Sequence, residues 1–321
     1  MLIEELSDNN KVKYNALAAQ YGTVFNSLDW LKMFGEKVKV YGIYDKGNNL
    51  IGGFTVYKER RFGLSIFRNP PFTPIMGPFL KVNAQNPVAI MDEWKKVVSL
   101  MADFIEDQCW SVISFSLNRS IVDTQPFFWK KFKVVPGYTY IIDLTKSIED
   151  VWKGMSAVRR NDINKATRDG LIVKQVWDFE VVKSLLLKTF LRQAITFNEY
   201  YLDKILFDFA NEGNSFAHVT FKDNNPIAAS FCIYDKSTAY YLISGYDYED
   251  RHHGAGAWAV WEAIQRAKEL SLKRFDFEGS MVPQIECYFR GFGGTLTPYY
   301  RINKARLPLE MLLKFFNREF F

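Results

Sequence analysis

Three strand-like segments in the second half of the chain constrain the fold more than any other feature. They read SFAHVTFKD, PIAASFCIYD and TAYYLISGYD, and only the short stretches DNN and DKS separate them. Connections this tight join antiparallel strands, because parallel strands need a crossover of about a dozen residues or more. We therefore expect an antiparallel meander between residues 215 and 247.

A glycine motif, R-x-x-G-x-G-A, follows the meander from Arg251 to Ala257 and opens a helix whose apolar residues recur at helical spacing. Glycines let the backbone approach a ligand, and the free N–H groups at a helix N-terminus favour an anion such as pyrophosphate. An ordinary strand-to-helix turn is the commoner meaning of so short a motif. Its place after the meander favours the anion, which makes the candidate donor-binding residues Arg251, His252, Gly254, Ala255, Gly256 and Ala257.

The remaining elements occur in the same order in both halves of the chain. The second half is predicted to contain a strand at Leu171–Trp177, helices near 181–192 and 198–212, and, after the motif helix, strand RFDFEGS, helix PQIECYFRGFGG and strand TLTPYYRIN. The first half is predicted to contain helices near 12–20 and 28–36, strands VYGIYD and LIGGFTVYKERR, an extended segment to Leu80, helix Pro87–Asp107, strand SVISFSLN, helix TQPFFWKKF and strand GYTYIIDL. YDKGNNLIGGF also resembles FKDNNPIAASF, and FFWKKF resembles CYFRGF, so we predict an internal duplication.

The duplication sets the predicted domain bounds. We expect a first unit over residues 1–145, a connector over 146–170, a second unit over 171–305 and a helical tail over 306–321. The connector is a helical stretch with a basic face that Gly170 closes. The first unit has RRFGLSIFRNPPFTPIMGPFL in place of the glycine motif, so we expect a donor site in the second unit only.

Part of the second half resembles the acyl-CoA loop of the GNAT acyltransferase superfamily. The resemblance rests on a hairpin, a strand that ends in SGYD and the motif R-x-x-G-x-G-A that opens a helix. With the duplication, VRRNDINKATRDG, FDFEGS and YFRGFGG, the chain from about Val24 to Asn303 resembles the Fem-type peptidyltransferases and their acetyltransferase-like relatives. The resemblance implies an α/β (α+β) fold of two tandem GNAT-like units, each a mixed, mainly antiparallel sheet flanked by helices. The chain lacks the long coiled-coil arm of the Fem-type enzymes.

Fem-type enzymes transfer amino acids from aminoacyl-tRNA to a peptide amine of a cell-wall precursor. The resemblance therefore implies an acyltransferase that moves an acyl or aminoacyl group to an amine in peptidoglycan or surface-polysaccharide precursor metabolism. Because the glycine motif is closer to a standard acyl-CoA loop, acyl-CoA is the favoured donor, and no permanently bound cofactor is expected. An aminoacyl-tRNA-dependent transferase and an inactive binding module of the same fold are the alternatives.

Two carboxylates in RFDFEGS are the candidate catalytic bases. In a strand, Phe275 and Phe277 would face the core while Asp276 and Glu278 share the other face. A carboxylate partly buried beside aromatic rings can take the proton of an attacking amine. We place Glu278 first and Asp276 second. The alternative is a solvated strand face, or ion pairs with Arg274 and Lys273.

The end of the preceding strand corresponds, by resemblance, to the place where GNAT enzymes polarise the acyl carbonyl with backbone N–H groups. Gly245 would permit the bulge that this requires. Tyr246 is a candidate acid for the leaving thiolate or hydroxyl, although packing is the commoner role of a tyrosine in a chain that has 17 of them.

Basic and aromatic residues outside the second unit are candidates for binding the acceptor. By resemblance, Trp30 and Arg68 line an acceptor cleft between the units. Arg159, Arg160 and Lys165 of the connector suit a phosphate or carboxylate on the acceptor. A merely solvated basic face is the usual explanation of such a run.

Charge and composition narrow the partners and the compartment. Lys and Arg number 41 against 36 Asp and Glu, and the net charge of +5 suits an anionic small molecule or a tRNA acceptor end but no large RNA or DNA footprint. Three widely spaced cysteines, and histidines without acidic partners, predict neither disulfides nor a metal site. No signal peptide or membrane span is visible, so we expect a cytoplasmic protein. The tail LPLEMLLKFFNREFF favours packing against the body or against a second subunit, with weak peripheral membrane contact as the alternative.

Overall fold

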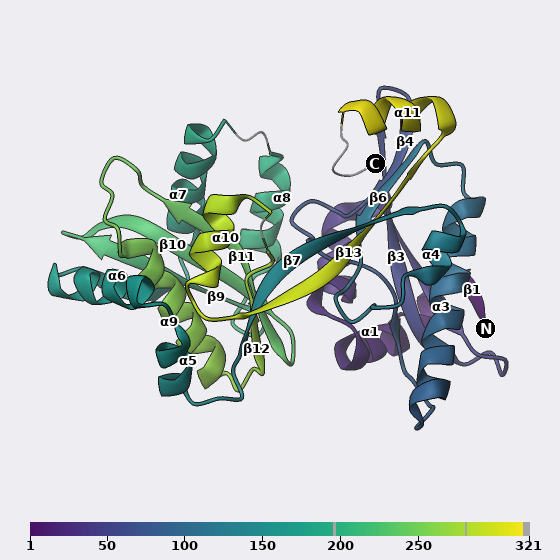
Figure 1. The fold of residues 1–321 in the computed structure, drawn as a ribbon, viewed down its shortest axis with the longest axis horizontal. Coiled ribbons are helices and arrows are strands. Elements are labelled where there is room, and N and C mark those ends of the chain that lie inside the picture. Colours follow the sequence, from purple (N-terminus) through teal and green to yellow (C-terminus); the bar gives the residue numbers. More distant parts are fainter. Residues whose placement is uncertain (195–196, 280, 317–321) are drawn as a thin grey trace. The chain divides into compact units, whose positions relative to one another are not determined.

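The computed structural model describes residues 1–194, 197–279 and 281–316, and the chain forms two compact units (Figure 1). Unit 1 consists of Met1–Gly137 and Pro298–Phe321, and unit 2 of Tyr138–Thr297. The boundary between them passes through two long strands, β7 (Lys133–Asp143) and β13 (Thr295–Ala305). The units therefore do not end at residues 145, 170 and 305, where the sequence-based division places its bounds.

An exchange of strands explains these bounds. In unit 1, residues 301–305 of β13 pair antiparallel with β6 (Val112–Ser116). In unit 2, residues 141–143 of β7 pair antiparallel with β12 (Arg274–Asp276). The last strand of each sheet thus comes from the other half of the sequence. A division by sequence halves cannot anticipate this, because each of the two strands carries an ordinary strand pattern.

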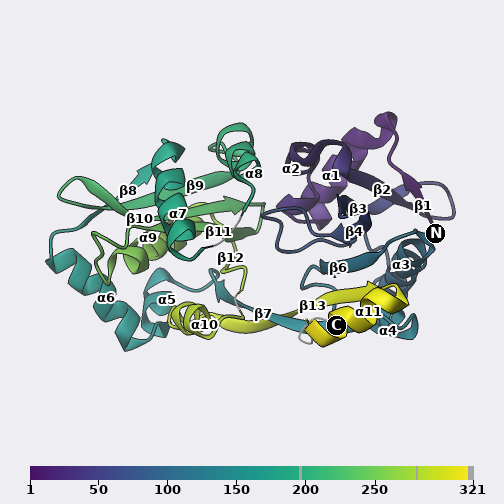
Figure 2. The same ribbon diagram turned by 90° about the horizontal axis from the view of Figure 1, so that it is seen from above.

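Unit 1 has the strand order β1-β2-β3-β4-β6-β13, with β5 beside β3, and β4 and β6 are parallel. The core of one face lies under α3 and α4 and the core of the other under α1, as the separate positions of these helices show (Figure 2). The remaining bounds are β1 Leu2–Glu5, β2 Val38–Tyr44, β3 Leu50–Arg61, β4 Leu64–Arg68, β5 Phe79–Leu80, α1 Lys11–Tyr21, α2 Leu28–Leu31, α3 Pro87–Asp107, α4 Gln125–Trp129, α11 Leu307–Phe316 and the 3-10 turns η1 Asp8–Asn10, η2 Val24–Asn26 and η3 Lys32–Lys37.

Unit 2 has the strand order β8-β9-β10-β11-β12-β7. The predicted meander is confirmed: β9, β10 and β11 pair antiparallel, whereas β11 and β12 are parallel because α9 crosses between them. The remaining bounds are β8 Ile172–Val176, β9 Ser215–Lys222, β10 Asn225–Tyr234, β11 Thr238–Tyr246, α5 Ile148–Gly154, α6 Ala157–Arg168, α7 Phe179–Arg192, α8 Glu199–Asp203, the π-helical turn η4 Lys204–Phe209, α9 Ala255–Glu269 and α10 Pro283–Arg290.

The two units repeat one plan. In each, three antiparallel strands lead into a long helix and then into a strand parallel to the third: β2-β3-β4-α3-β6 in unit 1 and β9-β10-β11-α9-β12 in unit 2. The apolar positions that predict α9 are all buried, namely Ala257, Val260, Trp261, Ile264 and Ala267. The predicted fold class, two tandem units of mixed sheet and flanking helices, is confirmed.

The connector forms two helices, α5 and α6, rather than one. Ser156 separates them, and its Oγ accepts a hydrogen bond from Arg159 N, which caps α6. Gly170 lies just beyond α6 with φ +78°, as its predicted capping role requires. Both helices belong to unit 2, where Val151, Met155 and Ile163 pack in the core with α9.

A buried histidine, His218 of β9, predicts acid sensitivity of folding. Its Nδ1 has no hydrogen-bond partner among the described residues, and burial, with the nearby Arg266 guanidinium, lowers the pKa of His218 to about 4. Because this pKa lies below the unfolded value of about 6.5, the contribution to stability is complete above pH 6.5 and is lost as the pH falls towards 4. As the pH falls from 6.5 to 4, we expect the free energy of unfolding to decrease by ~2–3 kcal/mol through this histidine. Chemical denaturation will measure the decrease, which should be absent in His218→Phe. An identical pH dependence of the two proteins would contradict this expectation.

Helix α11 departs from the sequence-based expectation. None of its residues is buried, so the described part of the tail does not pack into a core as the apolar sequence predicts. Residues 317–321 of the predicted 306–321 tail lie outside the described residues. No helix in the described ranges is long and apolar enough to cross a membrane.

Candidate active site

The two parallel strands of unit 2, β11 and β12, are paired only over the first three residues of each strand. Pairing runs from Thr238↔Arg274 to Tyr240↔Asp276, where β12 ends, whereas β11 continues to Tyr246. Beyond β12 the chain leans towards β7, since Phe277 N donates to Tyr140 O at 3.1 Å. Residues Tyr241–Tyr246 of β11 therefore have no pairing with β12, and we call this stretch of strand edge the opening. At its far end, Tyr246 N donates to Thr189 Oγ1 at 2.8 Å.

Glu278 lies at this opening in an unusual backbone conformation. Its φ is +61° and that of Gly279 is +78°, so two successive residues turn the chain sharply. A left-handed conformation costs a residue with a Cβ about 1–2 kcal/mol, and such strained residues cluster at active sites. The sequence-based reason for choosing Glu278 is wrong, because the strand ends at Asp276, two residues before Glu278. The turn, not strand alternation, sets its direction.

Asp276 supports this turn. Its carboxylate is buried, and Oδ1 accepts hydrogen bonds from Thr139 Oγ1 at 2.6 Å and from Glu278 N at 3.0 Å. These bonds hold the backbone of Glu278 in place. Arg274, the ion-pair partner expected in the alternative interpretation, donates instead to Thr238 Oγ1 and to Ser237 Oγ. The geometry therefore assigns Asp276 a positioning role and leaves Glu278 as the better candidate base.

The loop between β11 and α9 is fastened by a histidine. His252 Nδ1 accepts a hydrogen bond from Gly254 N at 3.1 Å, so the proton resides on Nε2, which lies 2.9 Å from Asp169 Oδ2. The hydrogen bond to His252 lowers the pKa of Asp169. Ala255 N donates to His252 O at 3.0 Å. Two of the N–H groups that the sequence assigns to the donor are thus already used within the loop.

The two glycines of the motif have different surroundings. A Cβ at Gly254 would overlap the backbone O of Asp162 in α6, so this glycine allows helix packing and not ligand approach, which corrects the sequence-based interpretation. A Cβ at Gly256 would meet only Tyr288 Oη, at 3.4 Å. Ala255 and Ala257 are fully buried and pack in the core. Gly256 is therefore the position of the motif that remains available to a ligand.

The end of β11 also differs from its prediction. The register of β10 and β11 shifts at Leu242, so the bulge lies there and not at Gly245, which pairs regularly with Ala229. A Cβ at Gly245 would come within 2.6 Å of the backbone of Leu185, so this glycine serves the packing of α7. Tyr246 donates through its hydroxyl to His252 O at 3.1 Å and so helps to hold the loop.

A second tyrosine, Tyr288 of α10, lies on the open side of the motif. Its hydroxyl faces the Cβ position of Gly256, and burial raises its pKa, so it stays protonated at neutral pH. The guanidinium of Arg159 stacks on the Tyr288 ring, 4.2 Å from the centroid, and pairs with Asp162 at 2.7 Å. Sequence reasoning missed Tyr288, although it stands in the repeated CYFRGF segment.

Two arginines flank a tyrosine beside the loop. The guanidinium carbons of Arg192 and Arg251 lie 4.6 Å and 4.8 Å from the Tyr248 ring centroid, and Arg251 also donates to Tyr248 Oη at 2.7 Å. Both side chains are exposed. One aromatic ring thus holds two positive charges close together, an arrangement that suits an anionic group such as phosphate. Only Arg251 is foreseen from the motif, because Arg192 is distant in sequence.

The structure does not bring the predicted acceptor residues together within one unit. The Arg159 side chain is only 11% exposed and is engaged with Tyr288 and Asp162. Arg160 donates to Lys153 O and Met155 O, which caps the end of α5. Lys165 is exposed on α6. Arg159 and Arg160 thus have structural roles. The exposure of Lys165 agrees with the alternative of a solvated basic face.

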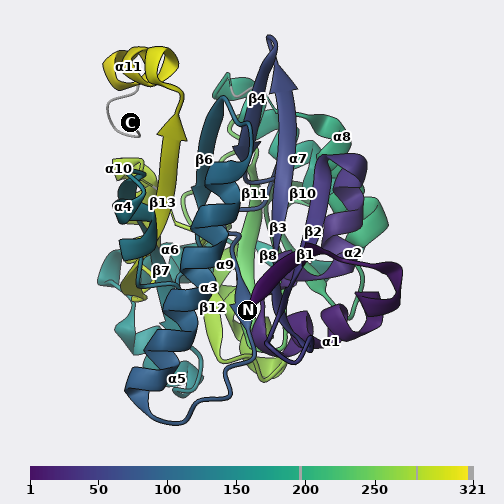
Figure 3. The same cartoon turned by 90° about the vertical axis from the view of Figure 1, so that its right-hand side faces the viewer.

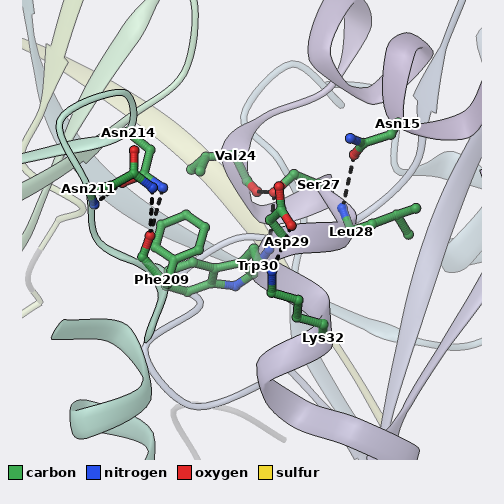
Figure 4. A network of polar contacts seen from close by, with 10 residues as sticks. All are labelled: Asn15, Val24, Ser27, Leu28, Asp29, Trp30, Lys32, Phe209, Asn211 and Asn214. Carbon is green, nitrogen blue, oxygen red and sulfur yellow. Dashed lines mark hydrogen bonds and ion pairs between the residues drawn. The ribbon is translucent and has the colours of Figure 1, made fainter. Parts of the chain in front are cut away.

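The predicted acceptor residues of unit 1 are engaged as well. Trp30 is fully buried and donates through Nε1 to Thr73 Oγ1 at 3.0 Å, and Ser27 caps its helix through Trp30 N (Figure 4). Arg68 Nε pairs with Glu59 Oε2 at 2.5 Å. The acceptor cleft between the units, with Trp30 and Arg68 in its lining, stays a prediction. Among the described residues, no group of three or more His, Cys, Asp or Glu side chains is placed to hold a metal ion.

Comparison with known proteins identifies the part of the chain that carries this site. Residues 179–284, from α7 to the start of α10, match the family model described as an acetyltransferase (GNAT) domain. This segment is a GNAT acetyltransferase domain. It contains the loop, Glu278 and the meander, whereas Tyr288 follows it. No curated protein matches the chain.

Solved structures share the fold of the GNAT domain and of the rest of the chain. FemX is similar with a TM-score of 0.68 and 12% identity, covering 98% of this chain and 100% of that one. The C-terminal domain of a putative lysylphosphatidylglycerol synthetase from Agrobacterium fabrum has a TM-score of 0.61 and 12% identity, covering 96% of each chain. A tandem GNAT protein from the clavulanic acid biosynthesis pathway has a TM-score of 0.54 and 11% identity, covering 94% and 97%. At these identities the likeness is one of fold.

Proposed function

We propose that this protein transfers an acyl or aminoacyl group from an activated donor to an amine of a cell-envelope precursor. The observation that carries the proposal is the open position at Gly256 of the motif loop, which the Tyr288 hydroxyl faces. The loop lies in the segment that matches a GNAT domain, and the same segment holds Glu278 in a left-handed conformation just after β12. The resemblance to Fem-type enzymes supports an acceptor from peptidoglycan or surface-polysaccharide metabolism.

The reaction is direct acyl transfer. The amine nitrogen attacks the acyl carbonyl, and backbone N–H groups near the end of β11 stabilise the oxyanion. The N–H of Tyr246 is excluded from this role, because it donates to Thr189 Oγ1 at 2.8 Å. Glu278 accepts the proton that the nitrogen loses, and the tetrahedral intermediate expels the donor's thiolate or ribose oxygen. Tyr288 donates its proton to that leaving group, for which its neutral state at pH 7 suits it. Tyr246 holds the loop through His252 O and is a positioning residue.

Acyl-CoA is the favoured donor. The loop keeps Gly256 open, and Arg192 and Arg251 provide two cations on Tyr248 for the phosphates of the donor. An aminoacyl-tRNA also carries backbone phosphates next to its aminoacylated end and would use the same cations, so it is the second candidate. A tRNA contact would involve many phosphates and a steeper dependence on salt.

Calorimetric titrations with acetyl-CoA and with an aminoacyl-tRNA test the donor. We expect acetyl-CoA to bind, and Arg251→Ala and Arg192→Ala each to weaken binding about tenfold, because each removes a charge-assisted contact. Arg168→Ala, which removes an exposed charge from α6, is the matched control and should bind as the wild type does. Binding of the tRNA alone would replace the CoA assignment, and equal affinities of all three variants would refute the arginine pair.

A further inference from the structure

The turn between β3 and β4 exposes a phenylalanine at a backbone position that disfavours it. Phe62 and Gly63 form a two-residue turn between the paired residues Arg61 and Leu64. Both have positive φ, 49° and 76°, a geometry in which Asn-Gly is preferred and a bulky residue is costly. Phe62 is also fully exposed. Neither the backbone conformation nor the burial of the side chain explains a phenylalanine here. Its position therefore indicates that the ring contacts another molecule.

Helix α11 presents a second apolar surface. Only Leu309, Glu310 and Leu313 are half-buried, on one side of the helix. The exposed side carries two rows at i, i+4, i+8 spacing that are apolar throughout: Leu307, Met311 and Phe315, and Pro308, Leu312 and Phe316. Phe315 alone is 82% exposed. A solvated helix carries polar residues on this side, so the pattern is inverted.

These two surfaces lie at the same end of unit 1. Figures 1 and 3 both show α11 and the turn joining β3 to β4 at the top of this unit, and α1 towards its opposite end. We call the exposed side of α11 together with Phe62 the tip surface. Two separate segments with exposed apolar side chains therefore lie at one end of the sheet of the unit.

The charges around the tip surface are mainly positive. Arg60 and Arg61 precede Phe62 and are exposed, and Arg306 and Lys314 are exposed at the start and near the end of α11. In sequence, the segment from residue 301 to 321 has five basic residues and two acidic ones. Aromatic and aliphatic side chains bordered by Lys and Arg are typical of segments that lie on anionic membrane surfaces.

We propose that the tip surface binds an anionic lipid surface, with Phe62 and the apolar rows of α11 inserted among the acyl chains near the headgroups. A second copy of the chain is a poorer occupant. A stable dimer buries about 800 Å² on each partner, and a helix of about 15 Å with one turn residue offers less. A lipid surface needs no shape match, and its negative charge complements the bordering arginines.

Vesicle co-sedimentation of the full chain tests this proposal without donor or acceptor, and so independently of the proposed function. We expect binding to vesicles of phosphatidylcholine with about one third phosphatidylglycerol, weak binding to phosphatidylcholine alone, and loss at high salt. Phe62→Ser and Phe315→Ser should each lower the partition coefficient about tenfold, because each removes an inserted ring. Arg60→Glu should lower binding to the anionic vesicles only.

Val12→Ser is the matched control. Val12 is 84% exposed on α1, towards the opposite end of unit 1, and this variant should bind vesicles as the wild type does. All these substitutions are on the surface, and equal thermal midpoints will show that folding is intact. Absence of vesicle binding at low salt, or equal loss in Val12→Ser, overturns the proposal. A wild-type dimer in solution that Phe315→Ser dissociates also overturns it, because a second copy then covers the surface.

Discussion

Glu278→Gln is expected to lower kcat by about 10²–10⁴-fold while donor affinity stays close to that of the wild type. Glutamine keeps the size of the side chain but cannot accept a proton, so only the proton transfer fails. The structure gives the reason for this choice. Glu278 has φ +61° where β11 and β12 separate, and its backbone N–H donates a hydrogen bond to the Asp276 carboxylate, which holds it there. Steady-state kinetics with the donor identified by titration, together with calorimetry of donor binding, will measure the two quantities.

Asp276→Ala serves as the comparison, because it removes the support and leaves the proposed base. We expect the free energy of unfolding to fall by about 2–4 kcal/mol, since the buried Thr139 hydroxyl and the Glu278 N–H both lose their acceptor. If Asp276→Asn abolishes turnover while Glu278→Gln does not, the roles are reversed. A wild-type protein that binds its donor but shows no turnover, and whose binding is indifferent to Glu278→Gln, would be an inactive binding module.

The features that follow from local pattern were predictable from sequence. The meander, α9 and α3 each combine a clear period with turn or capping residues, and α3 begins at Pro87 and ends at Asp107 as predicted. Local pattern did not reveal the exchange of β7 and β13, because which strand pairs with β6 depends on contacts between residues far apart in sequence. The fold class survives this error because each unit receives an equivalent strand.

The candidate site was predictable only in part, for the same reason. Arg251, Gly256 and Glu278 come from motif and resemblance, whereas Tyr288 and Arg192 enter through packing of α10 and α7. The predicted ligand-binding roles of two glycines failed because each glycine packs against a helix that is distant in sequence. The glycine requirement at Gly254 comes from α6 and at Gly245 from α7, and neither helix can be located from the motif itself.

Gly254→Ala is therefore expected to destabilise unit 2, whereas Gly256→Ala is not. The new methyl group at residue 254 meets the backbone O of Asp162, which can move only if α6 shifts against α9. Overpacking of this kind costs about 1–3 kcal/mol, and chemical denaturation will measure it. At residue 256 the methyl group makes an ordinary contact with Tyr288 Oη, and alanine gains up to about 1 kcal/mol over glycine within a helix.

The effects of these two substitutions on donor affinity should be the reverse of their effects on stability. Gly256→Ala fills the space beside Tyr288 that we assign to the donor, so its Kd for acetyl-CoA should rise about tenfold although the protein is as stable as the wild type or more so. Gly254→Ala should bind the donor normally at temperatures where it remains folded, because that glycine faces α6. If instead Gly254→Ala is stable and loses donor affinity, the glycine reaches the ligand after all, and the packing explanation of the motif is wrong. The two variants differ by the position of one methyl group on the same turn of α9, so each serves as the control of the other.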